Sequence, residues 1–392
     1  MGTKLSFSLS SLPFRYGAEQ SLLILTEEDT LTLSVWYDFD PRPLVLRGSI
    51  KKGDLCEIHL LDHAIGLYIN VRLQDEEWPK GNALWSAASL QELHPEPCPA
   101  PPRPPAVLEC FENAEGWRPE ENVFVGDCMP YVRDDAYHVL YLKDRHHHRS
   151  KWGLGAHQWE HISTHDFKTW RIHPTAVPIT DPEEGSVCTG SWLRKGQTEY
   201  LFYTLRRGNG IAAPIRRSLS DNGYHFEKDP QFGFCLPDCY RTASARDPQV
   251  FMGEDGRYHM LLTTALNAIN KGCLAHWVSE DLDHWEDAGE PLLIVPDGGS
   301  PECPDYFFYH GYYYLIYSLE GEGRYALSTQ PFTGFWEPEN PVIPCGKVPK
   351  AALWKDRIVF TGFQQIEGYA GTMTFLTATA DANGILRFQD PV

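Results

Sequence analysis

Apolar and polar residues alternate along short runs in the first quarter of the chain. Such runs cover residues 31–37, 57–61 and 66–73, and Asp, Gly and Pro residues separate them. Because successive side chains of a strand point to opposite faces of a sheet, this period of two predicts antiparallel strands with one buried face. We therefore expect a smaller N-terminal β-sandwich-like domain over residues 1–96.

A proline-rich segment at residues 98–105 follows these strands. Proline has no N–H group for a helix or a sheet, and runs of proline form stiff, extended connectors. We therefore place a Pro-rich linker at residues 97–106 and a larger domain at residues 107–392.

Two sequence signatures recur along the larger domain. The first is an aromatic, strand-like run, found at residues 137–141, 199–203, 258–262, 312–317 and 357–360. The second starts at a small residue and ends at an aromatic one, as in residues 163–170, 218–226 and 279–285, with weaker copies at 328–336 and 380–388. Successive copies of the first lie roughly 45 to 60 residues apart, the length of a four-stranded propeller blade. We predict an all-β fold in which a five-bladed β-propeller follows the sandwich.

Charge and composition exclude several classes of protein. With 53 acidic and 34 basic residues, the chain has a formal net charge of −19, which repels nucleic acids and anionic membranes. The N-terminus alternates instead of forming the apolar stretch of a signal peptide, and no run approaches the roughly 18 apolar residues of a membrane span. The ten cysteines lack metal-ligand spacing and are typical of reduced thiols. We expect a cytoplasmic protein with no nucleic-acid or membrane partner, no metal and no cofactor.

Three carboxylates lie in short motifs at the starts of separate blades. Asp127 belongs to Gly-Asp-Cys-Met-Pro at 126–130, Asp247 to Arg-Asp-Pro at 246–248 and Glu302 to Glu-Cys-Pro-Asp at 302–305. If these positions are on first strands, all three side chains face the central funnel of the propeller. Cleavage of a glycosidic bond needs such a set, because one carboxyl protonates the leaving oxygen while another attacks or activates water. We predict a glycosidase with Asp127, Asp247 and Glu302 as its catalytic residues.

The chain from about residue 124 to 388 resembles glycoside hydrolase family 32, the five-bladed fructosidases, and more distantly the furanosidases and xylosidases of family 43. The motifs at 246–248 and 302–305 carry the resemblance, together with 152–163 and Cys-Thr-Gly-Ser at 188–191. The resemblance implies that Asp127 is the nucleophile, Glu302 the general acid and base, and Asp247 the carboxylate that holds sugar hydroxyls. We expect Arg246 to keep Asp247 ionised, and the clustered carboxylates to raise the pKa of at least one of them.

The chain departs from the family pattern at several places. The nucleophile motif of the family usually reads Asn-Asp-Pro-Asn-Gly, whereas Gly126 precedes Asp127 here and Cys128, Met129 and Pro130 follow it. Leu142 stands where a Gln is expected, and the additional domain precedes the propeller instead of following it. The first two changes affect the pocket for the terminal sugar and therefore the choice of substrate.

Several further residues are candidates for the sugar site or for the core. The predicted substrate-binding residues are Arg246, Trp152, His157, Trp159, Thr189, Ser191 and Tyr306. We interpret Trp170 and Trp285 as packing between blades, and Cys303 as a buried thiol, since no base is placed to activate it. Three successive histidines at 146–148 are better explained by a solvated or substrate-contacting loop than by a metal site, because neighbouring side chains on a strand point to opposite faces.

We predict a retaining exo-glycosidase that removes a terminal furanoside, β-fructofuranosyl in the first instance, from short oligosaccharides or glycosides. One alternative keeps the fold but makes the enzyme an inverting arabinofuranosidase or xylosidase, with Asp127 as the base. Another is a carbohydrate-binding protein without catalysis. Transglycosylation stays open, because the acceptor is chosen by rim loops. The sequence also leaves open whether the N-terminal unit forms a rim, a lectin-like module or a homo-oligomer contact.

Overall fold

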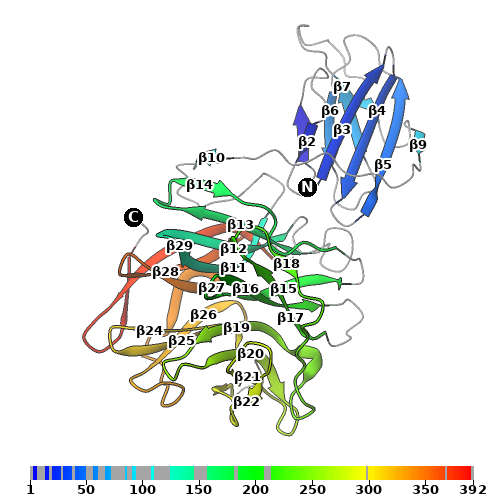
Figure 1. Cartoon of the computed structure of the whole chain (residues 1–392). Coiled ribbons are helices and arrows are strands. Elements are labelled where there is room, and N and C mark those ends of the chain that lie inside the picture. Colours follow the sequence, from blue (N-terminus) through cyan, green and yellow to red (C-terminus); the bar gives the residue numbers. More distant parts are fainter. Residues whose placement is uncertain are drawn as a thin grey trace. The chain divides into compact units, whose positions relative to one another are not determined.

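The computed structural model of the chain consists almost entirely of β-strands (Figure 1). It describes residues 124–144, 157–180, 184–206, 213–296, 299–366 and 369–389, and before them the strands β1 to β10. Over these residues there is no α-helix, only a short 3-10 helix at Thr242–Ser244, and no helical segment that could cross a membrane. The all-β prediction is confirmed.

The chain divides into two compact units. The first comprises residues 1–105 with 119–123 and 153–155, and the second comprises 106–118, 124–152 and 156–392.

The first unit contains two antiparallel sheets. One has the order β1 (Thr3–Ser6), β6 (Cys56–Leu60), β7 (Leu67–Val71) and β8 (Leu84–Trp85), and the other β2 (Phe14–Tyr16), β3 (Gln20–Glu27), β4 (Thr30–Tyr37), β5 (Asp40–Ser49) and β9 (Gln91–Leu93). The three alternating runs thus form strands, while the sandwich and the domain boundaries stay predictions.

The second unit is a series of antiparallel meanders, which we number in chain order. The first contains β11 (Phe124–Arg133), β12 (Ala136–Asp144), β13 (Gln158–Thr164) and β14 (Thr169–Ile172), with β10 (Val107–Glu109) paired to β14. The second contains β15 (Ser186–Lys195), β16 (Thr198–Arg206), β17 (Ile215–Ser220) and β18 (Glu227–Lys228). The third contains β19 (Arg246–Met252), β20 (Tyr258–Leu266), β21 (Lys271–Ser279), β22 (Glu286–Asp287) and β23 (Leu293–Ile294), which pairs with β21. The fourth contains β24 (Glu302–Tyr309), β25 (Tyr312–Leu319) and β26 (Glu322–Ser328), and the fifth β27 (Val342–Trp354), β28 (Arg357–Gln365), β29 (Gly371–Ala380) and β30 (Leu386–Gln389).

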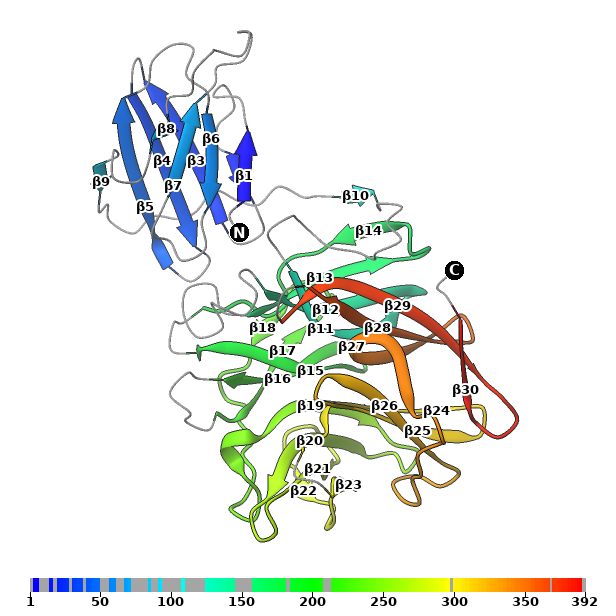
Figure 2. The same ribbon diagram turned by 180° about the vertical axis from the view of Figure 1, so that it is seen from behind.

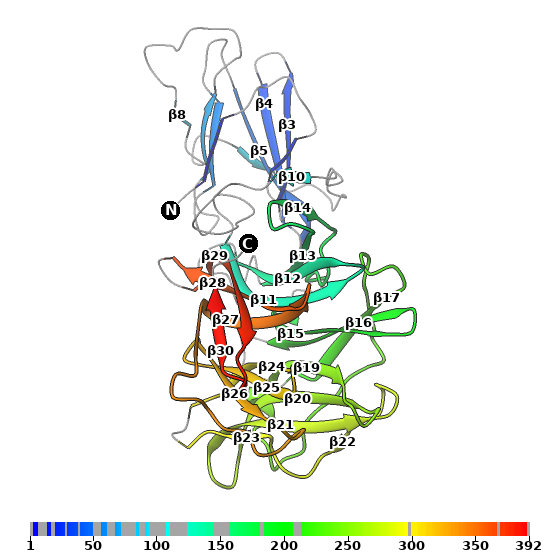
Figure 3. The ribbon, with the colours of Figure 1, turned by 90° about the vertical axis from the view of Figure 1, so that its left-hand side faces the viewer.

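The first strands of the five meanders form a closed cycle. Strand β11 contacts β15, β15 contacts β19, β19 contacts β24, β24 contacts β27, and β27 contacts β11. These strands gather in the middle of the unit (Figure 3), while β14, β22 and β30 lie at its periphery (Figure 2). The aromatic runs form the second strands, and the three predicted catalytic carboxylates lie on the first strands β11, β19 and β24. The five-blade count stays a prediction, and this cycle supports it.

Each first strand carries a β-bulge, which lies close to the start of β11, β15, β19 and β24 and near the middle of β27. The register shifts between Val125 and Cys128, and the corresponding shifts begin at Val187, Arg246, Glu302 and Lys347. A bulge places two residues opposite one and bends the strand, so it changes the direction in which a side chain points. On β19, β24 and β27 the first bulged residue is followed by proline, as in Asp247-Pro248.

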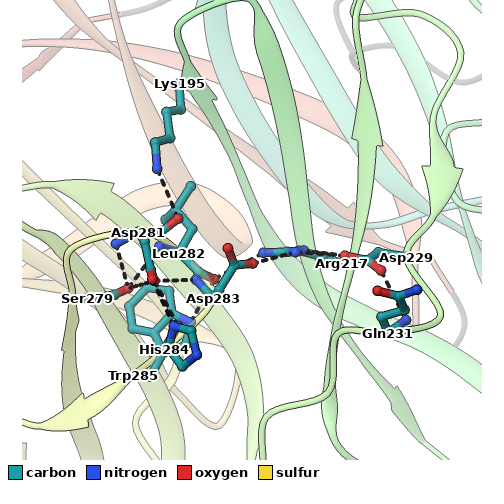
Figure 4. A network of polar contacts seen from close by, with 10 residues as sticks. All are labelled: Lys195, Arg217, Asp229, Gln231, Ser279, Asp281, Leu282, Asp283, His284 and Trp285. Carbon is teal, nitrogen blue, oxygen red and sulfur yellow. Dashed lines mark hydrogen bonds and ion pairs between the residues drawn. The ribbon is translucent and has the colours of Figure 1, made fainter.

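The second sequence signature forms a tight turn that closes the outer part of a meander. In the third meander Ser279 Oγ accepts the N–H groups of Asp281 and Leu282, and Asp281 Oδ1 accepts those of the next two residues. Figure 4 shows how this turn meets the second meander, where Arg217 pairs with both Asp229 and Asp283. The Ser and Asp of the signature are therefore explained by turn formation.

Aromatic side chains fill the spaces between meanders. Trp170 is fully buried and stacks on Phe375, and Trp285 packs against Phe202 in an edge-to-face contact. Both tryptophans contact neighbouring meanders, as expected of residues that hold blades together.

Candidate active site

The three predicted catalytic carboxylates converge on one cavity of about 330 Å³. Side chains from all five meanders line it, and the bulges of β11, β19 and β24 bring Asp127, Asp247 and Glu302 to its wall. The other lining residues include Leu142, His157, Cys188, Thr189, Arg206, Arg246, Cys303, Glu320, Lys347, Phe363, Gln365 and Tyr369. The predicted convergence of distant carboxylates is therefore present in the fold.

Asp127 is held through both of its carboxylate oxygens. Thr189 Oγ1 donates a hydrogen bond to Oδ2, and the Tyr369 hydroxyl donates to Oδ1 at 2.9 Å. The Cys303 thiol lies 3.6 Å from Oδ2. Because these donors come from β15, from the segment before β29 and from β24, the carboxylate has a fixed orientation before any ligand binds.

Glu302 is bound to Arg246 through a single oxygen. Arg246 Nε and Nη2 donate to Glu302 Oε1 at 3.2 and 2.6 Å, while Arg246 Nη1 donates to the Ser244 carbonyl at 2.7 Å. Within the described residues, Glu302 Oε2 has no hydrogen-bond partner, and the side chain is 37% exposed. This oxygen is available to exchange a proton with a ligand.

Asp247 differs from the other two carboxylates in being almost fully buried. Its side chain is 5% exposed, its Oδ2 accepts the Cys303 N–H at 3.1 Å, and Arg246 Nε lies 3.6 Å away. Burial raises the pKa of Asp247, and the nearby Asp127 charge adds to this effect, whereas Arg246 and the hydrogen bonds from Cys303 and Thr263 oppose it.

The expectation of a raised pKa in the carboxylate cluster is thus confirmed, although burial contributes more than clustering. Arg246 lowers the pKa of Asp247, the direction that favours ionisation, but does not outweigh burial.

Two site residues adopt a left-handed backbone. Asp247 has φ of +57° and Cys303 has φ of +51°, and each immediately precedes a proline. Residues other than glycine rarely have positive φ, and the residue before proline normally prefers an extended conformation. Such strain is held in place by surrounding contacts and is common at functional sites.

The predicted sugar-binding residues separate into two groups. Arg246, His157 and Thr189 line the cavity; His157 is buried, hydrogen-bonds Asp144 at 3.1 Å and stacks on Tyr369. Leu142, at the position where a Gln was expected, also lines it. Trp152 lies outside the described residues, as do the histidines at 146–148.

Trp159, Ser191 and Tyr306 do not line this cavity. Trp159 is fully buried, and its indole N–H donates to the Cys188 carbonyl at 2.9 Å. Ser191 Oγ donates to the Pro248 carbonyl and accepts the Val250 N–H, joining β15 to β19, and Tyr306 stacks on Phe251 in an apolar cluster. Their contacts are those of structural residues, because the strands turn these side chains away from this cavity.

Sequence reasoning missed Tyr369 and Lys347. Tyr369 is 242 positions from Asp127 and belongs to no motif, so no local signal marks it. Lys347 had a signal: Lys-Val-Pro at 347–349 repeats the pattern of a charged residue, any residue and proline seen at 246–248 and 302–304. Cys303 is buried as expected, and burial, with the neighbouring carboxylates, raises the pKa of its thiol well above the ordinary range. A protonated thiol is a poor nucleophile.

The comparisons with known proteins agree with this geometry. The family model described as the glycosyl hydrolases family 32 N-terminal domain matches residues 119–346. A sucrose-6-phosphate hydrolase of Bacillus subtilis is 31% identical over 203 residues, which are 48% of this chain and 41% of that protein. The Escherichia coli sucrose-6-phosphate hydrolase is 27% identical over 297 residues, 66% of this chain and 60% of that protein. The chain thus spans no more than 60% of the length of these two relatives.

Solved structures show the same fold. Fructan 1-exohydrolase IIa from Cichorium intybus superposes with a TM-score of 0.57 at 18% identity, covering 73% of this chain and 60% of that one. An α-L-arabinofuranosidase from Clostridium thermocellum gives a TM-score of 0.50 at 17% identity, covering 68% of this chain and 94% of that one. Since the family model covers more than half of the sequence and includes Asp127, Asp247 and Glu302, the chain belongs to family 32 of the glycosyl hydrolases.

Proposed function

We propose that the protein is a retaining exo-glycosidase that hydrolyses a terminal β-fructofuranosyl unit from a short oligosaccharide or glycoside. The observation that carries the proposal is the pairing of Asp127, fixed through both oxygens, with Glu302, which keeps one oxygen free at the same cavity. Relatives described as sucrose-6-phosphate hydrolase and beta-fructofuranosidase support the fructoside substrate. The predicted cytoplasmic location is part of the same proposal.

The proposed reaction has two steps. In the first, an Asp127 oxygen forms a bond to the anomeric carbon while the bond to the leaving oxygen breaks, and Glu302 gives its proton to that oxygen. In the second, Glu302 takes a proton from water, whose oxygen attacks the anomeric carbon and releases Asp127. Thr189 and Tyr369 orient the nucleophile, and Asp247 accepts hydrogen bonds from sugar hydroxyls. These steps use only side chains and water.

Proton NMR of the first product formed tests the reaction. The wild-type enzyme is mixed with fructosides, arabinofuranosides and xylosides, and the configuration of the released sugar is followed over time. We expect fructose with retained configuration, and a loss of about 10⁴-fold or more in kcat for Asp127→Asn. Glu320→Gln is the matched control, because Glu320 lines the same cavity from an exposed turn and has no role in the proposed steps.

Each other outcome has a defined meaning. Release of an inverted pentose would replace the proposal by the inverting mechanism, with Asp127 as the base. Sugar binding without turnover by the folded wild-type protein, across the whole panel, would make the chain a carbohydrate-binding protein.

A phosphorylated fructoside is the second candidate substrate. Lys347 lines the cavity and is half-buried, and its side-chain ammonium group forms no hydrogen bond or ion pair within the described residues. A lysine without an anionic partner in a substrate cavity is suited to bind a phosphate group. The relatives described as sucrose-6-phosphate hydrolase favour the same choice.

Lys347→Met separates the two substrates. For sucrose 6-phosphate we expect KM to rise about 10- to 100-fold, because a charge-assisted hydrogen bond contributes roughly 1.5–3 kcal/mol. For sucrose we expect little change. An equal effect on both substrates would show that Lys347 does not recognise the phosphate.

A further inference from the structure

Three histidines of the first meander meet away from the catalytic cavity. His138 lies on β12, His161 on β13, and His173 directly follows β14. One ring nitrogen from each lies within 4.8 Å of the other two. The antiparallel register produces this cluster, because the His173 N–H donates to the His161 carbonyl and brings the outer segment beside β13. Tyr131 of β11 pairs with His138 across the sheet and adds a hydroxyl group.

The hydrogen bonds of His161 do not match its two ring nitrogens. His161 Nε2 has two partners, the Tyr131 hydroxyl and His138 Nδ1, each at 2.9 Å. A ring nitrogen serves one partner well, either through its hydrogen or through its lone pair. His161 Nδ1 is buried and has no hydrogen-bond partner among the residues that the structure describes. His161 Nε2 therefore has two neighbouring polar groups, although one ring nitrogen can form a good hydrogen bond to only one of them.

The fold encloses the three rings: His138 and His161 are buried, and the Ser163 hydroxyl bonds His173 Nε2 at 2.8 Å. His173 is only half-buried, so an ion has a route from solvent.

The third meander provides an internal comparison, because the same two strand positions also hold histidines. His259 and His276 occupy the register of His138 and His161, and their rings are bonded at 2.8 Å. There Phe251 replaces Tyr131, and Ala288 donates its N–H to the His276 carbonyl as His173 does to His161.

The remaining nitrogen of His259 bonds Asp255 at 2.9 Å, and Phe332 stacks on both rings. The histidine pair thus serves packing in the third meander. Only the first meander adds two further ligand groups to it.

We propose that His138, His161 and His173 bind a divalent transition metal ion of the zinc class, with Tyr131 or a solvent molecule completing the coordination. Imidazole nitrogens are preferred ligands of zinc, with a Zn–N distance of about 2.0–2.1 Å. Nitrogens on one tetrahedral ion lie about 3.3 Å apart by that distance. The three ring nitrogens must therefore draw closer together to bind one ion, and His173 is the most exposed of the three residues. The ion joins three strands of the first meander and stabilises that part of the fold.

Zinc binding to the full chain tests the site. The protein is stripped with a chelator, dialysed against zinc, and analysed for bound metal and Tm, with Co²⁺ absorption as a report on tetrahedral geometry. We expect one equivalent per chain and a rise in Tm that saturates with zinc. His173→Gln should lower the affinity at least about 100-fold, since even an outer partner of a metal ligand contributes 10- to 100-fold.

Two variants serve as matched controls. His276→Gln removes the corresponding histidine of the third meander, and the replacement of residues 146–148 by alanine removes the other concentration of histidines in the chain. Both should bind zinc as the wild type does. If His173→Gln does not fold by circular dichroism, His138→Gln takes its place. Absence of bound zinc in the wild type, or wild-type binding by the folded His173→Gln or His138→Gln protein, would overturn the proposal.

Discussion

Two cavities lie on either side of the bulges of β19, β24 and β27, and they differ in how their polar groups are used. The residues directly before the bulges, Arg246, Glu302 and Lys347, line the catalytic cavity. The residues directly after them, Gln249, Asp305 and Lys350, line a separate cavity of about 180 Å³. Each of the three strands therefore supplies residues to both cavities, one residue before its bulge and one after it.

In the second cavity the charged side chains have hydrogen-bond partners within the protein. Lys350 is 2% exposed, and its Nζ donates to Gln249 Oε1, to the Pro304 carbonyl and to the Gly190 carbonyl. Asp305 accepts the backbone N–H groups of Tyr306 and Ala351, one on each oxygen. These contacts join four of the five meanders.

The catalytic cavity is different, because Glu302 Oε2 and the Lys347 ammonium group have no partner there within the described residues. Groups before the bulge keep capacity for a ligand, whereas groups after it hold the meanders together.

Glu302→Gln should have the largest effect, and it should affect catalysis far more than stability. Loss of the proton that Glu302 exchanges should lower kcat by about 10²- to 10⁴-fold, the usual contribution of general acid–base catalysis. Because a glutamine amide oxygen can still accept the Arg246 N–H groups that Glu302 Oε1 accepts, only the charge assistance of that pair is lost, and we expect the free energy of unfolding to fall by no more than about 1.5 kcal/mol. Steady-state kinetics and urea unfolding measure the two quantities. An equal loss of stability would place Glu302 with the structural groups.

Lys350→Met should have the opposite pattern. It leaves three buried acceptors without a donor, and each unsatisfied group contributes roughly 1–3 kcal/mol, so we expect the free energy of unfolding to fall by about 3 kcal/mol or more. Lys347→Met is the matched control three positions earlier, with an expected change within about 0.5 kcal/mol. Urea unfolding of both proteins checks the comparison, which fails if the two variants are equally stable.

Asp247→Asn should give the smallest effect, a gain in stability that grows with pH. An aspartate in an unfolded chain titrates near pH 3.9, whereas burial raises the pKa of Asp247 in the fold. Between about pH 3.9 and the higher pKa of the folded state, the folded protein binds more protons than the unfolded chain. The free energy of unfolding of the wild type therefore decreases as the pH rises through this range, and it stays at the lower value above it. Asparagine removes this loss and still accepts the Cys303 N–H. The difference in unfolding free energy should be absent near pH 3 and favour the variant at pH 7.

Asp305→Asn is the contrasting substitution on the other side of the bulge. Burial also raises the pKa of Asp305. However, each of its two oxygens accepts a backbone N–H group. In an asparagine at this position, the side-chain NH₂ group would lie against one of these N–H groups, so that two donors meet and no hydrogen bond forms. We expect this variant to be less stable than the wild type at pH 7. A gain in stability for both variants would show that burial of charge alone governs the two sites.

Much of the fold follows from local pattern, and most of the site follows from the fold. Period-two alternation located the strands of the first unit, and the aromatic runs located the second strands of the meanders. Because the carboxylate motifs precede those runs, their place on first strands could be predicted. Trp159 was predicted to bind sugar but is fully buried outside the cavity, because a tryptophan that stacks on sugar and one that fills a core have the same local pattern.

The backbone conformation of the bulges was beyond prediction for a physical reason. A residue before proline is expected to be extended, yet Asp247, Cys303 and Val348 all have positive φ. Neighbouring strands impose this conformation, and sequence rules for a dipeptide do not include them. The role of Tyr369 could not be predicted for a related reason, since only the closed cycle of strands brings it to Asp127.

The tyrosine that holds Asp127 also restricts how this chain can have diverged from the usual family motif. A Cβ atom at Gly126 would lie 2.6 Å from the Tyr369 hydroxyl, closer than two such atoms can approach. A side chain at position 126 therefore requires the Tyr369 ring to move away from the position in which its hydroxyl bonds Asp127. The glycine at 126 is thus the condition under which this tyrosine can hold the carboxylate, so the two positions act as a single structural unit.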